Sequence, residues 1–189
     1  MGGEISAFIA IHLSPEITKE LGDLQTSLKR SNADCKWVKP DSIHLTLKFL
    51  GNIAPERIEE IKNTLDNIAI HHKPFELSLS NIGGFPRLES PRVIWAGIDK
   101  GCLETEAIAR DLEGELAKRG FQKEERSFSA HLTLGRVRTP KNRKALIENI
   151  KALDFKPSAS ATVNKILLFR STLTPQGSIY TVIHEAGFG

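Results

Sequence analysis

A short motif occurs twice in this chain. Residues 42–47 read Ser-Ile-His-Leu-Thr-Leu and residues 129–134 read Ser-Ala-His-Leu-Thr-Leu, so the two copies agree at five of six positions. Alternation of polar and apolar residues is typical of a strand with one face on a core. Each motif therefore predicts a strand that presents Ser, His and Thr on one face and apolar side chains on the other.

The elements around the two motifs also repeat. Apolar periodicity and capping residues predict helices at about 15–30, 55–69, 102–119 and 141–152. Strands are predicted at 5–13, 35–38, 43–50, 75–79, 93–98, 131–137, 159–163, 166–170 and 178–186. The Gly-Gly-Phe-Pro stretch at 83–86 is typical of a loop. Both halves then follow the order helix, histidine strand, helix, strand, strand, which indicates an internal duplication.

This order predicts an α+β fold. Strands that follow one another over short loops favour antiparallel pairing, and the chain lacks the Gly-rich first turn of a doubly wound parallel sheet. We expect residues 1–189 to form a single bilobal domain with two mostly antiparallel sheets facing a central cleft and helices on the outside. The two histidine strands would face each other across that cleft, where a shared site would form.

Composition sets wide limits. With 189 residues and 40% hydrophobic content, the chain can bury a substantial core. Its first apolar run ends at Leu13 and is too short and interrupted for a signal or membrane helix, which predicts a cytoplasmic protein that does not enter a membrane. Cys35 and Cys102 are far apart, which favours reduced thiols. The formal charge of +3 is compatible with a phosphate-bearing partner but does not identify one.

The repeated polar face suits acid–base chemistry on a phosphate. Side chains at i and i+2 of a strand lie roughly 6.5 to 7 Å apart, so a threonine hydroxyl can donate to a non-bridging oxygen while the neighbouring imidazole moves a proton. An ordinary histidine pKa of about 6.5 allows one ring to be charged and the other neutral. A purely structural histidine is the alternative, but both copies keep the polar face as well as the apolar one. The candidate catalytic residues are His44, His131, Thr46 and Thr133.

Other side chains near the motifs could bind the substrate. Lys48 shares the face of His44 if alternation continues, whereas Arg136 points away from His131 unless a bulge or twist occurs near Gly135. The candidate substrate-binding residues are Lys48, Arg136 and, as a phosphate contact and a base-stacking surface, Arg92 and Phe85.

Four segments resemble a known family. Residues 37–51, Trp-Val-Lys-Pro-Asp-Ser-Ile-His-Leu-Thr-Leu-Lys-Phe-Leu-Gly, resemble the first signature of the 2H phosphoesterase superfamily, specifically its RNA 2',3'-cyclic phosphodiesterase branch, also called the tRNA-half 2'-5' RNA ligase family. Residues 128–137 are similar to the second signature, 91–97 to the middle block and 171–180 to the C-terminal block. Ala130 stands where the family commonly has proline, and we expect only a local backbone effect.

The resemblance implies an enzyme that hydrolyses an RNA 2',3'-cyclic phosphate end to a 2'-phosphate, with no metal or other cofactor. It also implies reversible 2'-5' ligation, with tRNA halves as one substrate. By resemblance His44 is the proton donor and His131 the proton acceptor, although the near symmetry of the motifs leaves that order open. Because the cleft is internal, we expect a monomer with RNA as its partner and no obligate protein partner.

Two rival functions can be distinguished. A metallophosphoesterase usually requires several His and carboxylate ligands, yet neither motif contains Asp or Glu. A noncatalytic RNA-end-binding module would favour exposed aromatic residues, which make up only 6% of the chain. Insensitivity to a chelator would exclude the first, and turnover of a small cyclic nucleotide would exclude the second.

Overall fold

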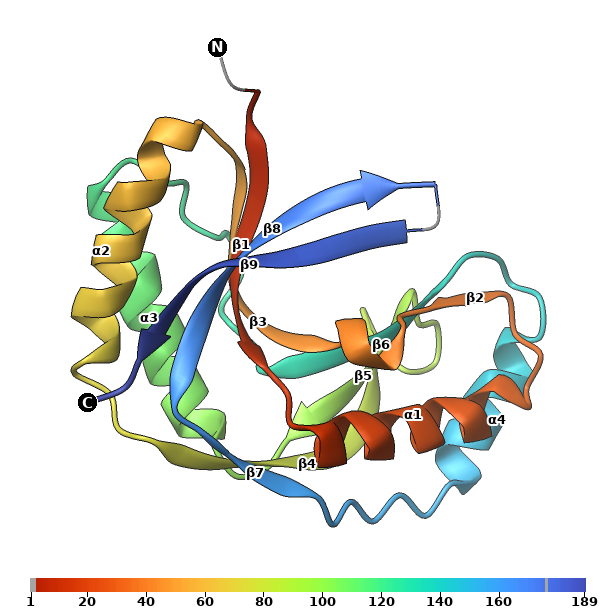
Figure 1. The fold of residues 1–189 in the computed structure, drawn as a ribbon. Coiled ribbons are helices and arrows are strands. Elements are labelled where there is room, and N and C mark those ends of the chain that lie inside the picture. Colours follow the sequence, from red (N-terminus) through yellow and green to blue (C-terminus); the bar gives the residue numbers. More distant parts are fainter. Residues whose placement is uncertain (1–2, 176) are drawn as a thin grey trace.

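The computed structural model describes residues 3–175 and 177–189 (Figure 1). A four-stranded sheet has the order β3 (His44–Ile53), β1 (Ile5–His12), β8 (Lys165–Thr174) and β9 (Gly177–Gly187). A five-stranded sheet has the order β2 (Cys35–Trp37), β6 (His131–Val137), β5 (Val93–Ile98), β4 (Phe75–Phe85) and β7 (Ser160–Val163). Every strand pair is antiparallel. The predicted α+β fold with two antiparallel sheets is confirmed.

The helices lie outside these sheets (Figure 1). They are α1 (Pro15–Lys29), α2 (Ile58–Ala69), α3 (Cys102–Lys118) and α4 (Arg143–Ala152), with 3-10 turns η1 (Pro40–Ser42) and η2 (Pro55–Arg57). The Ser14 side chain caps α1 by accepting from the Ile17 N–H, and Pro15 follows as its first residue. Across the described ranges, no helix has the length and apolar character needed to cross a membrane.

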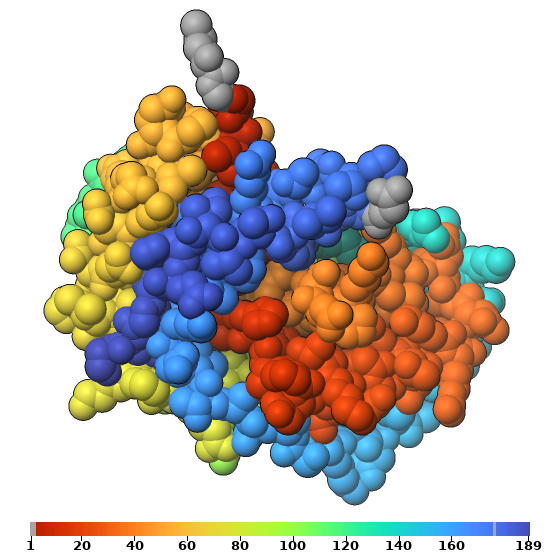
Figure 2. All heavy atoms as spheres, viewed as in Figure 1, coloured from red at the N-terminus to blue at the C-terminus, as the bar shows by residue number. Residues whose placement is uncertain are grey.

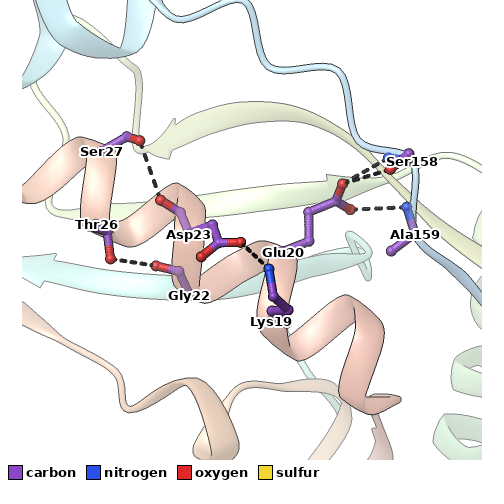
Figure 3. A network of polar contacts seen from close by, with 8 residues as sticks. All are labelled: Lys19, Glu20, Gly22, Asp23, Thr26, Ser27, Ser158 and Ala159. Atoms are coloured by element: carbon purple, nitrogen blue, oxygen red, sulfur yellow. Dashed lines mark hydrogen bonds and ion pairs between the residues drawn. The ribbon is translucent and has the colours of Figure 1, made fainter.

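Helix α1 is tied to the second half of the chain (Figure 3). The Glu20 carboxylate accepts the Ser158 N–H at 2.8 Å and the Ala159 N–H at 3.3 Å, just before β7 begins. The neighbouring Lys19–Asp23 ion pair is exposed, so solvent screens it strongly. The contact of Glu20 therefore joins α1 to a segment that is distant in the sequence.

The two halves exchange strands. β3 pairs with β1 in one sheet as β6 pairs with β5 in the other. However, β4, which follows α2, pairs with β5, whereas β8 from the second half pairs with β1. The orders β3-β1-β8-β9 and β6-β5-β4-β7 therefore correspond, and each contains chain from both halves. The lobes are thus not the two halves of the sequence.

The loop predicted at residues 83–86 is wrong for its first three residues, which complete β4. Gly83 pairs with Trp95 in β5, and a Cβ on Gly83 would lie 2.0 Å from the Trp95 ring. The glycine is therefore required by close packing of an aromatic ring rather than by a turn.

The segment at 171–180 forms the end of the β8–β9 hairpin, with residue 176 outside the described residues. In the space-filling view this hairpin, in blue, extends over the orange segment that contains β3 (Figure 2). Its Ser171 and Tyr180 are cross-strand partners, and both line the cavity that contains the histidines.

Candidate active site

His44 and His131 are the first residues of β3 and β6. The leucine that follows each of them, Leu45 or Leu132, is fully buried, whereas the histidines themselves are half-buried. The predicted alternation of apolar and polar side chains therefore holds at the start of both strands.

A main-chain carbonyl orients each imidazole. His44 Nδ1 lies 2.9 Å from the Ser42 carbonyl oxygen, and His131 Nδ1 lies 2.7 Å from the Ser129 carbonyl oxygen. Because a carbonyl can only accept, Nδ1 carries a proton in both rings, and Nε2 is left for proton transfer. Ser42 and Ser129 precede the strands, as the predicted strand ranges had it, and their main-chain carbonyls hold the imidazoles.

Both His-x-Thr motifs line one cavity. It has a volume of about 700 Å³, within the range of sites for small ligands. The predicted residues that it brings together are His44, Thr46, His131, Thr133, Phe85 and Arg136, and Lys48 borders it as well.

Aromatic rings surround His44. The Phe8 ring stacks on the imidazole with centroids 4.6 Å apart, and the Tyr180 ring meets it edge-on at 5.1 Å. Burial lowers the pKa of His44 below its ordinary value of 6.5, because desolvation disfavours the imidazolium form. The hydrogen bond to Ser42 opposes this shift, and His12, its partner across β1, adds to it. His44 is therefore biased towards the neutral form in the unliganded protein.

The surroundings of His131 are different. The Phe85 ring meets its imidazole edge-on at 5.0 Å, and Phe85 also packs against Trp95 at 5.2 Å. Phe85 thus lies beside the second histidine, as a base-stacking residue would.

A β-bulge follows the motif in both copies. Ile9 pairs with Lys48 and Ala10 with Thr46, which leaves Leu47 without a partner in β1. In the same way, Leu134 has no partner in β5, because the register passes directly from Thr133 to Gly135. A bulge shifts the alternation of all following side chains by one residue.

The bulge in β3 turns the Lys48 ammonium away from the position that strict alternation gives it. Its side chain is only 1% exposed, and Nζ lies 2.8 Å from Glu113 Oε2 of α3 and 2.9 Å from the Gln122 carbonyl. Strict alternation would have placed this ammonium beside the His44 imidazole. Instead Phe49, which is 60% exposed, takes the position on the cavity wall.

The sequence predicted that Arg136 could face the cavity only if a bulge occurred near Gly135, and β6 contains such a bulge. The shift at Leu134 returns the Arg136 side chain to the face of His131, and Arg136 is exposed and lines the cavity. The Leu134 carbonyl accepts from Gln25 Nε2 of α1 at 2.8 Å, which helps to hold the bulge.

Arg92 is not brought to the cavity. Its neighbour Val93 lines the cavity, and successive residues in an extended segment point to opposite faces, so Arg92 is directed elsewhere and is exposed. Its main chain bonds to Phe85 and Val137. The expected phosphate contact at Arg92 is therefore not supported.

Sequence reasoning missed part of the cavity wall. Phe8 comes from β1, Tyr180 from β9 and Arg126 from the segment between α3 and β6. Tyr180 ends the segment 171–180 that resembles the family's C-terminal block, but no local motif marks Phe8 or Arg126, because their proximity to the histidines depends on the pairing of distant strands. Within residues 3–175 and 177–189, no three His, Cys, Asp or Glu side chains are grouped as a metal site would require.

The comparison with protein families gives a direct result. The family described as LigT like Phosphoesterase matches residues 11–95 and 102–180. This chain belongs to that family. The predicted family resemblance is confirmed.

Named relatives of this LigT-like phosphoesterase cover nearly its whole length. An RNA 2',3'-cyclic phosphodiesterase of Methanothermobacter thermautotrophicus is 35% identical over 178 residues, which are 94% of this chain and 96% of the relative. One from Methanocaldococcus jannaschii is 36% identical, covering 94% of this chain and 98% of the relative.

Solved structures share the fold. TT0787 of Thermus thermophilus has a TM-score of 0.80 at 25% identity, covering 97% of this chain and 98% of that one. E. coli LigT complexed with 3'-AMP has a TM-score of 0.78 at 24% identity, covering 98% of each chain. The second likeness concerns the fold alone.

Proposed function

We propose that this LigT-like phosphoesterase hydrolyses the 2',3'-cyclic phosphate at an RNA end to a 2'-phosphate, without a metal or another cofactor. The observation that carries the proposal is the pair of imidazoles that line one cavity, each with Nδ1 bonded to a main-chain carbonyl. Relatives named RNA 2',3'-cyclic phosphodiesterases support the choice of substrate.

The reaction needs one proton acceptor and one proton donor. In the proposed mechanism, His131 Nε2 takes a proton from water as its oxygen attacks phosphorus. The bond from phosphorus to the ribose 3'-oxygen breaks, and that oxygen receives a proton from His44 Nε2. The product is a 2'-phosphate with a free 3'-hydroxyl, and solvent restores the two protonation states.

The charge of the substrate supports the proposed role of His44 as the donor. Its pKa is lowered in the unliganded cavity, so the ring is mostly neutral there at neutral pH. An anionic cyclic phosphate beside the ring favours imidazolium, and its arrival would supply the charged form. His44 is thus charged mainly when substrate is present.

The remaining cavity residues have binding roles in this proposal. Thr46 and Thr133 donate their hydroxyls to the non-bridging oxygens, where negative charge develops in the transition state. Arg136 contributes a cation near the phosphate, and Phe85 offers a ring for the terminal base.

The same ring opening can use another nucleophile. If a 5'-hydroxyl replaces water, the cyclic phosphate becomes a 2'-5' linkage, so we retain ligation of tRNA halves as a prediction. We also propose that residues 1–189 act as a single bilobal domain, as a cytoplasmic monomer without an obligate protein partner.

The test is hydrolysis of an oligonucleotide that ends in a 2',3'-cyclic phosphate, in excess EDTA and then with Mg²⁺ added back. We expect equal rates and a product that carries a 2'-phosphate. Turnover only with added metal, or a 3'-phosphate product, would contradict the mechanism. Binding without turnover would favour a noncatalytic RNA-end-binding module.

A further inference from the structure

A second hollow adjoins the active-site cavity. It has a volume of about 500 Å³ and lies between the end of β3 and residues 121–126, which follow α3. Four residues line both spaces, so one continues into the other: Phe49, Gly51, Glu124 and Arg126.

Aromatic rings lead from the catalytic imidazole towards this shared rim. The Phe8 ring stacks on His44, and the Phe49 ring lies 6.2 Å from Phe8 by centroids. Phe49 is 60% exposed although it borders both spaces. An exposed ring at the junction of two cavities offers a surface on which a nucleobase can stack.

The wall of the second hollow is well anchored. The Lys48 ammonium bonds to the Gln122 carbonyl at 2.9 Å, and the Glu113 carboxylate accepts the Glu124 N–H at 2.9 Å. The Arg57 guanidinium lies 4.0 Å from the centroid of the Phe121 ring. The same buried ion pair that holds β3 to α3 therefore also fixes the segment that forms this wall.

The charges in the hollow suit one phosphate rather than a long polyanion. Lys123 and Arg126 are exposed, and neither forms an ion pair with another described residue. Glu124 and Glu125 line the same hollow and balance the two cations. A single phosphate next to Arg126 would gain from its charge, whereas further phosphates would meet the acidic side chains.

The chemistry of the substrate defines what can extend from the cavity. A 2',3'-cyclic phosphate occupies the 3' end of an RNA, so the rest of the chain can leave only through the 5'-oxygen of the terminal nucleoside. We propose that the hollow between Phe49 and residues 121–126 binds the nucleotide that precedes the cyclic end, with its phosphate at Arg126. This inference rests on the proposed function and makes the preferred substrate at least a dinucleotide.

The test compares kcat/KM for adenosine 2',3'-cyclic phosphate, the ApA dinucleotide with a cyclic end and the corresponding trinucleotide. We expect the dinucleotide to exceed the mononucleotide by about tenfold or more, as one stacked base and one phosphate contact would give. The trinucleotide should add less than about threefold, because the second hollow holds one nucleotide.

Two charge-reversal variants locate the effect. Arg126→Glu should lower the ratio of dinucleotide to mononucleotide kcat/KM towards one, because the proposed phosphate contact is replaced by repulsion. Lys144→Glu makes the same change in net charge on α4, outside both spaces, and should leave that ratio as in the wild type. A wild-type ratio near one, or equal effects of the two variants, would overturn the second subsite while leaving the proposed function intact. Failure to turn over any of the three substrates would instead overturn the proposed function itself.

Discussion

The strands β3 and β6 begin with the same four residues, His-Leu-Thr-Leu, and both have a bulge at the fourth. Their sequences differ immediately afterwards. The next residue is Lys48 in β3 and Gly135 in β6. β3 is an edge strand, and its lysine reaches Glu113 of α3. β6 is not an edge strand, because β2 pairs with it, and a Cβ on Gly135 would lie 2.6 Å from Cys35 Sγ of β2. The neighbouring strand therefore decides which side chain fits.

The following position also differs, with Phe49 in one copy and Arg136 in the other. Both side chains are returned to the cavity by the bulge. The duplicated part thus supplies two equivalent imidazoles and hydroxyls, while the residues beyond the bulge supply an apolar surface on one side and a cation on the other. In the proposed mechanism, the residues that the two copies share carry out the proton transfers, and the residues that differ bind the substrate.

The largest expected effect is on the rate of hydrolysis, and a second substrate distinguishes the roles of the two histidines. His44→Ala should slow hydrolysis of the cyclic RNA end by at least about a hundredfold, but it should slow a 4-nitrophenyl phosphodiester much less, because nitrophenolate leaves without a proton. His131→Ala should slow both substrates similarly. The exposed His71, outside the cavity, gives the control His71→Ala. The opposite pattern of sensitivity would exchange the two roles.

The threonines test whether the two copies are equivalent. Thr46→Val and Thr133→Val remove one hydroxyl each at nearly constant volume. Each variant should lower kcat/KM by roughly ten- to a thousandfold, as loss of a transition-state donor does. Steady-state kinetics on the cyclic-phosphate oligonucleotide provide the measurement, and an unchanged rate in either variant would show that its hydroxyl does not contact the phosphate.

The arginine beyond the second bulge should contribute mainly to binding. Arg136→Met should raise KM by about tenfold or more, because a charge-assisted contact to the substrate phosphate is lost. Arg92→Met is the matched control, since Arg92 is also exposed and close in the sheet but does not line the cavity. Equal increases in KM for both variants would indicate a general charge effect instead.

Lys48 should matter for stability. Lys48→Met leaves Glu113 without its buried partner, and we expect the free energy of unfolding to fall by about 3 kcal/mol. Adding Glu113→Leu should recover much of that loss, because an apolar pair of similar volume avoids an uncompensated charge. Urea denaturation of the single and double variants measures both values, and additive losses would argue against a coupled pair.

The smallest effect concerns pH. If the reaction needs one imidazole protonated and the other neutral, kcat/KM follows a bell-shaped pH profile, and the lowered pKa of His44 places one of its two limbs below pH 6.5. In kcat, which reports the substrate complex, that limb should move to higher pH because the phosphate favours imidazolium. Profiles of both constants in wild-type protein provide the check, and limbs at the same pH in both would contradict substrate-induced charging.

Local sequence patterns predicted the elements and the centre of the site well. The helices and strands occur close to where apolar periodicity placed them, and the two His-x-Thr motifs line a single cavity. These features depend on residues adjacent in the chain. The order of these elements extended them to a fold with two sheets, which the structure contains.

The misses share a non-local cause. Lys48 was misplaced because a bulge depends on how a strand pairs with its neighbour, and Gly83 was read as part of a loop because the Trp95 ring that covers it belongs to another strand. The aromatic wall around His44 combines Phe8 and Tyr180 from opposite ends of the chain. The exchange of β4 and β8 between sheets likewise leaves no local signal.

The central claim is that the two equivalent imidazoles together carry out phosphodiester hydrolysis. The most direct measurement is turnover of one cyclic-phosphate oligonucleotide in EDTA by wild-type protein, His44→Ala and His131→Ala, at equal concentrations of protein shown to be folded by circular dichroism. We predict a 2'-phosphate product from the wild type and at least about a hundredfold slower formation by each variant. A wild-type rate in either variant would contradict the two-histidine mechanism.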